Sequence, residues 1–507
     1  MAGIGFSLKR LFGKKGILNL CKAYGYAGVV TTGPMLLGVL LLVGVAFIGR
    51  IGGVPAHDRE LLNCMLTYSL LASLFVTSWF NMAVTRFVSD MLYENKQEKV
   101  LPSFFGTVSI ELVLCTLLYG TFLLMTEATV LQKLLCLWFS LTLIVVWTEM
   151  IYMTALQDYQ SIILAFAICL MIGFLLALIL VLLGKASLES LLLCVIIAYG
   201  LLAVRLLKLM QDYFPKSGGS HFSFLRWFAR YRSLSISGGM VTIGLFSHLI
   251  IMYFGPLRVQ VQGLFYGAPE YDVPALIAFF SLLITTVSFV TSVEVNFYPK
   301  YSNYYGLFND RGAIRDIELA EKEMLDVLRR ELIYLGCKQL FTAVLFVVVG
   351  TTALPTLMPG ISSLSLSIFR FLCVGYGVYA IANSMMLLEL YFEDYAGALI
   401  GTIAFAVVST GATVWQILYG STDYFGVGFF AGAILFFFIA LVRLSWYTGR
   451  LPYFLLSRQS LVPKKEKGPL AFIAEKLDER VLSRRQAEAQ ARMDEANKLL
   501  EKEGLLK

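Results

Sequence analysis

The sequence has few charged residues and few histidines for a chain of its length. Of its 507 residues, 15% are charged and three are histidine, whereas 58% are hydrophobic. Soluble globular chains average about 25% charged and about 45–50% apolar residues. This chain therefore lacks the polar residues that would cover the surface of a soluble protein. The same shortage of charge, combined with high hydropathy, excludes a disordered chain. Composition indicates a polytopic membrane protein.

Motifs of soluble enzymes are also missing. The sequence contains no Walker lysine loop, no GxSxG, no HExxH and no Rossmann glycine fingerprint. Its eight cysteines are scattered without a CxxC pair, so we interpret them as small hydrophobic residues and not as disulfides or metal ligands. We predict a protein that is not an enzyme, has no catalytic residues, and binds no metal or cofactor.

Long apolar runs take up about half of the chain. A run of about 20 residues crosses a hydrocarbon core about 30 Å thick. Counting such runs predicts twelve spans, at approximately 24–49, 61–87, 102–126, 131–155, 160–183, 189–210, 233–254, 274–297, 332–354, 364–388, 396–418 and 424–447. The predicted fold class is an all-α polytopic membrane protein with about twelve transmembrane helices.

Basic residues gather on one side of this topology. With the N-terminus inside, the opposite side carries only six of them, which are Arg50, Arg59, Lys133, Lys185, Arg258 and Arg370. Cytoplasmic segments of membrane proteins carry the excess of lysine and arginine, so both termini are predicted to be cytoplasmic. The net charge of +7 then reflects the orientation of the protein in the membrane and a basic surface for lipid or a protein partner. We expect no nucleic-acid partner.

The domain organisation follows from the spans and from two internal similarities. The basic aromatic stretch Phe6-Ser-Leu-Lys-Arg-Leu-Phe12 precedes the first span as Phe222-Ser-Phe-Leu-Arg-Trp-Phe228 precedes the seventh, and Phe-Val-Thr-Ser occurs at Phe75–Ser78 and at Phe289–Ser292. Coincidence or duplication explains these matches, and duplication predicts two parallel six-helix lobes, an arrangement suited to transport. We divide the chain into an amphipathic N-terminal segment (1–23), an N-lobe (24–211), a cytoplasmic linker (212–232), a C-lobe (233–447) and a basic cytoplasmic tail (448–507).

Polar and ionisable residues at membrane depth are costly, so each is a candidate for a role in translocation. The candidates are Asn81, Arg86, Asp90, Glu111, Glu149, Glu294, Asn296, Lys338, Arg370 and Glu389. Arg86 and Asp90 are four residues apart and share a helix face, which fits a structural end-cap pair or a gating role. Glu149 with Arg86 and Glu294 with Lys338 are further pairs that the sequence leaves open.

Two glycine-containing segments are candidate hinges. Gly33 and Pro34 lie inside the first span, where proline removes a backbone donor and disfavours helix at the preceding residue. Gly238 and Gly239 occupy the corresponding place in the seventh span. Each segment is interpreted either as a packing kink or as part of a moving helix that lines a cavity.

Several segments carry a family resemblance. They are Met1-Ala-Gly-Ile-Gly-Phe6, Ala23-Tyr-Gly-Tyr-Ala-Gly28, Thr85-Arg-Phe87, Val293-Glu-Val-Asn-Phe-Tyr-Pro-Lys-Tyr301 and Leu390-Tyr-Phe-Glu-Asp-Tyr395. The chain resembles the PelG family of Pel exopolysaccharide transporters, placed in the MOP flippase superfamily, over residues 1–395. The resemblance implies a MOP/MurJ-like fold in a bacterial cytoplasmic membrane, a hexosamine-rich polysaccharide as substrate, and partners that include a PelF-like cytosolic glycosyltransferase and PelD-like and PelE-like membrane proteins.

The expected function is therefore export of Pel-type polysaccharide by a flippase-like transporter. Two alternatives stay open: a lipid-linked oligosaccharide flippase or small-molecule exporter of the same superfamily, and a non-transporting membrane scaffold for the polysaccharide synthase. The charged tail departs from the family pattern. It is interpreted as a helix held on anionic lipid or as a docking helix for the glycosyltransferase.

Overall fold

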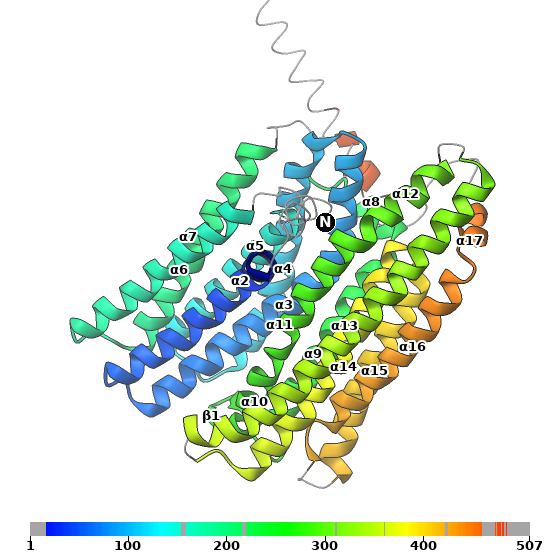
Figure 1. Ribbon diagram of the computed structural model, residues 1–507. Coiled ribbons are helices and arrows are strands. Elements are labelled where there is room, and N and C mark those ends of the chain that lie inside the picture. The colour runs from blue at the N-terminus through cyan, green and yellow to red at the C-terminus, as the bar shows by residue number, and fades with distance from the viewer. Residues whose placement is uncertain are drawn as a thin grey trace, which may run out of the picture.

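The long helices of the chain run mostly along one direction (Figure 1). The computed structural model describes residues 17–153, 159–214, 220–309, 312–358, 360–420 and 424–458, together with 472, 474–477, 479–480 and 483. Most of the predicted N-terminal segment and of the basic tail lies outside these ranges.

Six long helices form the first half of the structure. They are α2 (Ile17–Ile51), α3 (Ala56–Tyr93), α4 (Val100–Met125), α5 (Val130–Met153), α6 (Tyr159–Leu182) and α7 (Leu188–Tyr213), with a short 3-10 turn at Gln97–Lys99. Within this series α5 packs against α3, α4 and α7, and α6 packs against α2 and α7. The short helix α8 (Leu225–Arg230) packs on α3 and leads into the second half.

The second half contains the longer and more interrupted elements. They are α9 (Arg232–Met252), the antiparallel hairpin of β1 (Val259–Gln262) and β2 (Phe265–Gly267), α10 (Pro269–Phe279), α11 (Ser281–Thr291), the π-helical turn η2 (Ser292–Phe297), α12 (Tyr298–Asn309), α13 (Ile314–Leu357), α14 (Ser363–Tyr391), α15 (Tyr395–Tyr419), α16 (Val427–Thr448) and α17 (Leu451–Arg458). Here α15 packs against α9 and α16, and α14 packs against α10, α13 and α16.

Eleven helical segments in the described part of the chain are long and apolar enough to cross a membrane. One of them, Pro269–Asn309, is a succession of α10, α11, η2 and α12. The first predicted span, 24–49, falls in α2, whose apolar stretch Leu36–Ile51 is shorter than the others. At 1.5 Å per residue the 44 residues of α13 extend about 66 Å, so this helix projects well beyond a hydrocarbon core about 30 Å thick.

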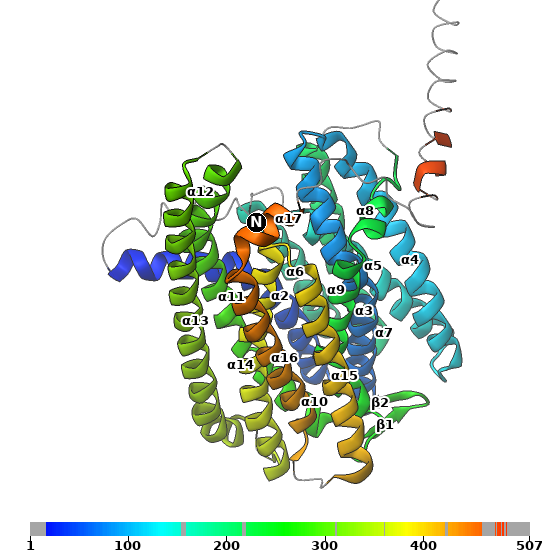
Figure 2. The ribbon, with the colours of Figure 1, turned by 90° about the vertical axis from the view of Figure 1, so that its right-hand side faces the viewer.

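The hydrophobic core is divided along the sequence. One cluster is formed by buried residues from Leu41 to Phe228 together with Phe265 and Ala474, and two others by residues from Met252 to Leu451. We call α2–α8 the first helix group and α9–α17 the second. They lie side by side in Figures 1 and 2, and their main contacts are α3 with α9 and α2 with α11.

Helix α2 changes direction along its length. Figure 2 shows its first part lying across the other helices and its later part running along them. The helix assignment continues through Gly33 and Pro34, and Pro34 is the one proline in α2, the residue type that most often causes such a bend. A role of this segment in movement stays a prediction.

Gly238 and Gly239 lie where α9 comes closest to α3. A Cβ atom added to Gly238 would lie 2.4 Å from the carbonyl oxygen of Ser78, and one added to Gly239 would lie 2.5 Å from the Trp79 ring. The Ser235 hydroxyl also donates a hydrogen bond to the Trp79 carbonyl. The helix is continuous here, so the glycines act structurally as contact residues between the two groups, and their predicted role as a hinge stays untested.

Replacing Gly238 by alanine should destabilise the protein by about 2 kcal/mol, because the new methyl group meets a backbone carbonyl that cannot move without the helix. Gly411→Ala is the matched control, since Gly411 lies within α15 and a Cβ there meets nothing within 4 Å. The melting temperature of the detergent-purified protein measures both. Equal melting temperatures for the two variants would contradict the close contact.

Candidate functional site

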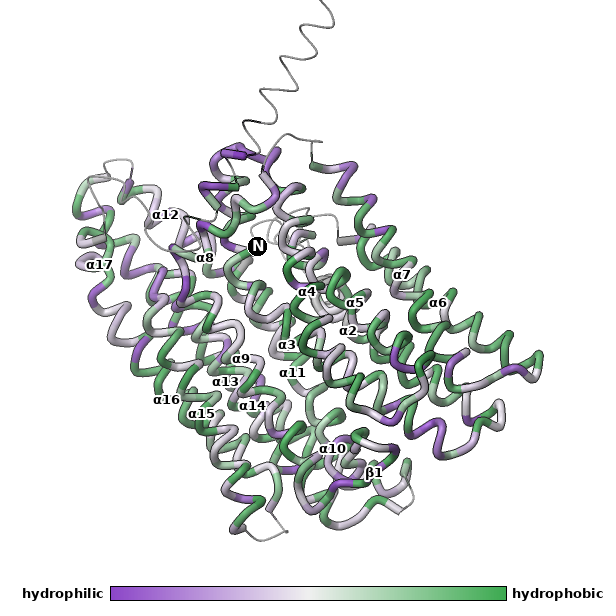
Figure 3. The backbone as a smooth tube through the Cα atoms, turned by 180° about the vertical axis from the view of Figure 1, so that it is seen from behind, coloured by the Kyte–Doolittle hydropathy of each residue, from purple (hydrophilic) through white to green (hydrophobic). Residues whose placement is uncertain are grey.

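The two ends of the molecule differ in polarity. One end carries α8, α12 and α17, and Figure 3 shows hydrophilic residues concentrated there. We call it the charged end, and we call the opposite end, which carries β1 and β2, the hairpin end. Helix α3 runs from one to the other, with Tyr68 in its first half, on the side of the hairpin end, and Arg86 and Asp90 near its finish. The first and second helix groups meet through side chains at both ends.

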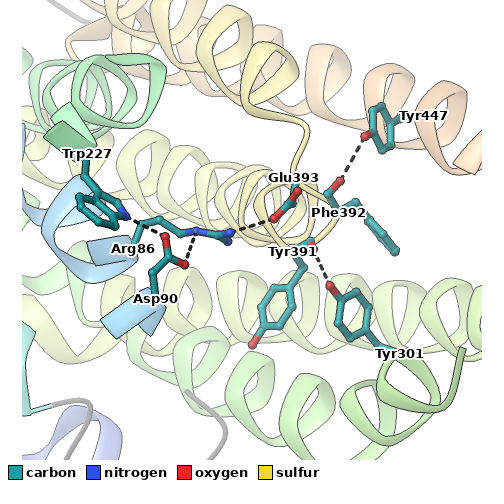
Figure 4. A network of polar contacts seen from close by, with 8 residues as sticks. All are labelled: Arg86, Asp90, Trp227, Tyr301, Tyr391, Phe392, Glu393 and Tyr447. Carbon is teal, nitrogen blue, oxygen red and sulfur yellow. Dashed lines mark hydrogen bonds and ion pairs between the residues drawn. The ribbon is translucent and has the colours of Figure 1, made fainter. Parts of the chain in front are cut away.

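At the charged end, Arg86 links α3 to the second helix group (Figure 4). Its Nε lies 3.0 Å from Asp90 Oδ1 on the same helix, and its Nη2 lies 3.0 Å from Glu393 Oε1 in the turn between α14 and α15. The predicted pair of Arg86 and Asp90 is therefore present. The alternative pair of Arg86 and Glu149 is not formed, since neither carboxylate oxygen of Glu149 has a hydrogen-bond partner among the described residues.

Residues of α8 and of the connection to α9 hold the side chains of Arg86 and Asp90 in place. The Trp227 indole Nε1 donates a 2.7 Å hydrogen bond to Asp90 Oδ2, which leaves Oδ1 for Arg86. The Arg86 guanidinium lies 5.5 Å from the centre of the Tyr231 ring, close enough for a cation–π contact. Burial raises the pKa of the Tyr231 phenol by more than the nearby Arg86 cation lowers it, so the phenol stays neutral. Asp90 and Tyr231 thus hold the Arg86 side chain in the direction of Glu393.

The turn that carries Glu393 is fixed by its surroundings. The last carbonyls of a helix have no partner within the helix, and here two tyrosines supply donors: the Tyr301 hydroxyl bonds the Tyr391 carbonyl at 3.0 Å, and the Tyr447 hydroxyl bonds the Phe392 carbonyl at 3.1 Å. Glu393 itself has a φ of +62°, a conformation that costs a non-glycine residue free energy and needs a rigid setting.

Asp394 anchors the same turn to α16 and α15. Its carboxylate accepts two hydrogen bonds from Arg443, at 2.6 and 2.9 Å, and a third from the backbone N–H of Gly397, at 3.2 Å. The third bond caps the start of α15. Asp394 is fully buried, whereas the side chains of Arg86 and Glu393 are 33% and 48% exposed. Two adjacent acidic residues therefore form one internal and one superficial ion pair.

At the hairpin end, the second helix group reaches into the first. Phe265 of β2 is fully buried in the first core cluster. The Tyr68 hydroxyl of α3 donates to the Tyr266 carbonyl at 3.0 Å and lies 3.3 Å from the Tyr266 N–H. The Gln262 amide donates to the carbonyl of Glu127, after α4, at 3.2 Å. The hairpin is thus docked on the first group by apolar burial and by backbone hydrogen bonds.

The other candidates from the sequence do not converge on either contact. Asn81 is exposed on α3, and Arg370 is exposed on α14, where its Nε donates to Thr351 Oγ1 at 3.3 Å. The Asn296 amide donates to Glu331 Oε1 at 3.0 Å, and the Lys338 ammonium lies 4.1 Å from the centre of the Tyr334 ring. The side chain of Glu294 lies outside the described residues.

Three acidic candidates are buried within the helix groups. Glu111 and Glu149 are fully buried in the first group, on α4 and α5. Glu389 is 1% exposed near the end of α14, in the second group. No cluster of three or more histidine, cysteine or acidic side chains suited to a metal ion occurs in the described ranges. The polar contacts at the two ends therefore make up the candidate site.

The fold and the sequence both have known relatives. The model of the PelG putative exopolysaccharide exporters (EPS-E) matches residues 1–455. The chain belongs to this family. No protein with a curated description matches it in sequence. Membership of the exporter family, together with the membrane-spanning helices, makes the chain a multi-pass membrane transporter.

Solved structures of MATE transporters have the same fold as this exporter-family chain. A MATE protein in the straight conformation has a TM-score of 0.56 at 10% identity, with 85% of this chain and 96% of that chain covered. An inward-facing multidrug resistance MATE transporter of the MOP superfamily has a TM-score of 0.54 at 11% identity, with 85% of this chain and 100% of that chain covered. A MOP superfamily transporter from Pyrococcus furiosus, described as having a binding pocket of reverse polarity, has a TM-score of 0.52 at 11% identity. That match covers 84% of this chain and 96% of that chain.

The sequence alone did not identify the residues of the second helix group that take part in the contact at the charged end. Glu393 and Asp394 lie within the segment Leu390–Tyr395, which carries part of the family resemblance, and that was the one signal that pointed to them. From sequence, Arg443 is one of many basic residues on the predicted cytoplasmic side, and Trp227 is part of the basic aromatic stretch Phe222–Phe228. Their partners are far away in sequence, so spacing held no further clue.

Proposed function

We propose that the chain exports a Pel-type, hexosamine-rich polysaccharide across the bacterial cytoplasmic membrane, by passage between two lobes of six spans each. The first and second helix groups are these lobes, and α2 supplies the twelfth span. The observation that carries the proposal is the pair of contacts between the groups, one at each end of α3, in a member of an exopolysaccharide exporter family with a MATE-like fold. Passage of a polymer requires that both contacts separate.

The charged end is proposed to face the cytoplasm, with both termini on that side. The excess of lysine and arginine supports this orientation, because cytoplasmic segments carry more of these residues. The contact of Arg86 with Glu393 then closes the cytoplasmic mouth, and the hairpin closes the outer one. Anionic lipid headgroups and a cytosolic partner are natural neighbours for such a surface.

The two closures differ in strength. An exposed ion pair contributes about 0.2–1 kcal/mol, so thermal motion opens the contact of Arg86 with Glu393 readily. Full burial of a phenylalanine contributes about 1.5–3 kcal/mol, and the hairpin adds hydrogen bonds to Phe265. The outer mouth is therefore the tighter barrier, which suits a protein that accepts polymer from inside and must limit leakage from outside.

The partners are proposed from the family resemblance. A PelF-like glycosyltransferase supplies polymer at the cytoplasmic mouth, and PelD-like and PelE-like membrane proteins hold it there. The basic tail, most of which lies outside the described residues, is proposed to contact lipid or this enzyme.

Export can be tested in a bacterial strain that makes the polysaccharide and lacks this gene. We expect polymer to accumulate inside the cells, and the wild-type chain to restore secretion, because the polymer has no other path across the membrane. Secreted and cell-retained hexosamine polymer are measured separately. Normal secretion without the chain would refute the transport function, and loss of polymer synthesis with no internal accumulation would favour a scaffold.

A further inference from the structure

Glu111 is a buried carboxyl group that the contacts between the helix groups do not use. It is fully buried on α4, which packs mainly against α5 and α3. Helix α4 begins at Val100, so eleven residues at 1.5 Å each place Glu111 about 16 Å from that end, near the middle of a core about 30 Å thick. An ionised carboxylate at this depth requires a cation or several donors.

The surroundings of Glu111 supply neither. Among the described residues, its Oε1 has no hydrogen-bond partner, and its Oε2 is hydrogen-bonded by the Thr148 hydroxyl of α5. The basic groups of the packed helices lie toward the helix ends: Arg59 in the first turn of α3, Arg86 near its finish, where it pairs with Asp90, and Lys133 in the first turn of α5. The titratable groups in the last two turns of α5 are the phenol of Tyr152 and the carboxyl of Glu149, and neither is a cation.

Counting hydrogens gives the state of the carboxyl group. Thr148 Oγ1 lies within hydrogen-bonding distance of Glu111 Oε2 and 2.9 Å from the carbonyl oxygen of Ile144. A hydroxyl carries one hydrogen, and a carbonyl oxygen can only accept. If the threonine donates to Ile144, as threonines in helices commonly do, the hydrogen between Thr148 and Glu111 belongs to the glutamate. Both contacts are satisfied when Glu111 is a neutral carboxylic acid.

Three hydroxyl groups lie together on the charged-end side of Glu111, between α4 and α5. Ser103, Thr107 and Glu111 are four residues apart on α4, and Thr148 and Tyr152 are four apart on α5, so each set shares a helix face. The Tyr152 hydroxyl lies 3.0 Å from Ser103 Oγ and 3.4 Å from Thr107 Oγ1.

Ser103 follows Pro102, whose carbonyl oxygen lies 3.1 Å from Nδ1 of His221. The Ser103 and Thr107 hydroxyls donate to the carbonyls of Val100 and Ser103 in this structure, so transfer of a proton along this side of α4 requires these hydroxyls to rotate and accept it.

We propose that Glu111 is a proton-binding site inside the first helix group, filled from the charged end through Ser103, Tyr152 and Thr107. A proton from cytoplasmic water forms an O–H bond on the Glu111 carboxyl group and neutralises it. Release of the proton leaves a carboxylate, which this buried site, with a single hydrogen bond from Thr148, does not stabilise. Binding and release are therefore tied to a change in the packing of α4 on α5, and this links a proton to the movement of the first group.

Infrared difference spectroscopy of the full chain in lipid nanodiscs tests the proposal without polymer. At pH 7, the wild-type spectrum minus the Glu111→Gln spectrum should show one carboxylic acid C=O band that moves to lower frequency in D2O. The amide of glutamine preserves the shape and can still donate to Thr148. Glu323→Gln is the control: Glu323 is exposed and lies 2.6 Å from the ammonium of Lys300, so its difference spectrum should contain carboxylate bands only.

A second variant identifies the acid band through its neighbour. Thr148→Val removes the hydroxyl contact and retains the volume, so the Glu111 band should persist and move to higher frequency. Carboxylate bands in place of an acid band in the Glu111→Gln difference spectrum would overturn the proposal, as would an acid band that Thr148→Val leaves unmoved. Both readings are independent of export, so failure here and failure of the transport function are distinguishable.

Discussion

A disulfide between Cys64 and a cysteine introduced by Gly267→Cys is expected to stop export, and a reducing agent is expected to restore it. Gly267 ends β2, and a Cβ atom added there would lie 3.6 Å from the Cys64 Sγ atom. This separation fits the close approach of two cysteines in a disulfide. Cys64 belongs to α3 of the first helix group and the hairpin to the second, so the bond would lock the outer mouth.

The measurement is polymer secreted by cells before and after a mild oxidant, in a background with the exposed Cys337 replaced by serine. Secretion should fall in proportion to the cross-linked fraction, which a mass spectrum of the joined peptides reports. Gly267→Cys combined with Cys64→Ser is the matched control and should be insensitive to the oxidant. Full secretion by fully cross-linked protein would show that the hairpin stays docked during export.

The hairpin also shows what the sequence could not predict. Hydropathy located the spans on either side of it, because a span needs only a run of apolar residues. Between them, hydropathy predicts only a short external loop, residues 255–273. Its docking depends on Phe265 entering a core built by residues from Leu41 to Phe228, and no periodic pattern in a single chain reports such a contact.

The contact at the charged end was likewise predictable from the sequence only in part. Arg86 and Asp90 are neighbours on one helix face, so their pair follows from the spacing. Glu393 lies 307 residues from Arg86, and its meeting with Arg86 depends on the packing of the two groups. Glu111 was a candidate for the cleft because it is a carboxyl group at membrane depth. The structure places it between α4 and α5, and from this position we propose proton binding, whereas its contact with polymer stays a prediction.

Asp394→Asn is expected to lower the free energy of unfolding by about 3 kcal/mol. Glu393→Gln, at the neighbouring residue, should change the same free energy by less than about 1 kcal/mol. Asparagine can still cap α15 through its side-chain oxygen, but it leaves Arg443 without its buried counter-charge. Breaking a buried ion pair costs about 3–5 kcal/mol, and the lower value applies because Arg443 is 27% exposed. Thermal unfolding of the detergent-purified variants measures the difference.

Glu393→Gln should act instead on the cytoplasmic mouth. Loss of the ion pair with Arg86 removes a contact between the two groups without disturbing either one, so the mouth should open more often. A cysteine introduced by Ser235→Cys, between α9 and α3, reports this opening through its rate of labelling by a thiol reagent. We expect faster labelling with Glu393→Gln, and an unchanged rate with Glu323→Gln, which breaks an exposed ion pair within the second group. Equal labelling in both variants, or a large loss of stability with Glu393→Gln, would show that the ion pair of Arg86 and Glu393 serves folding and not gating.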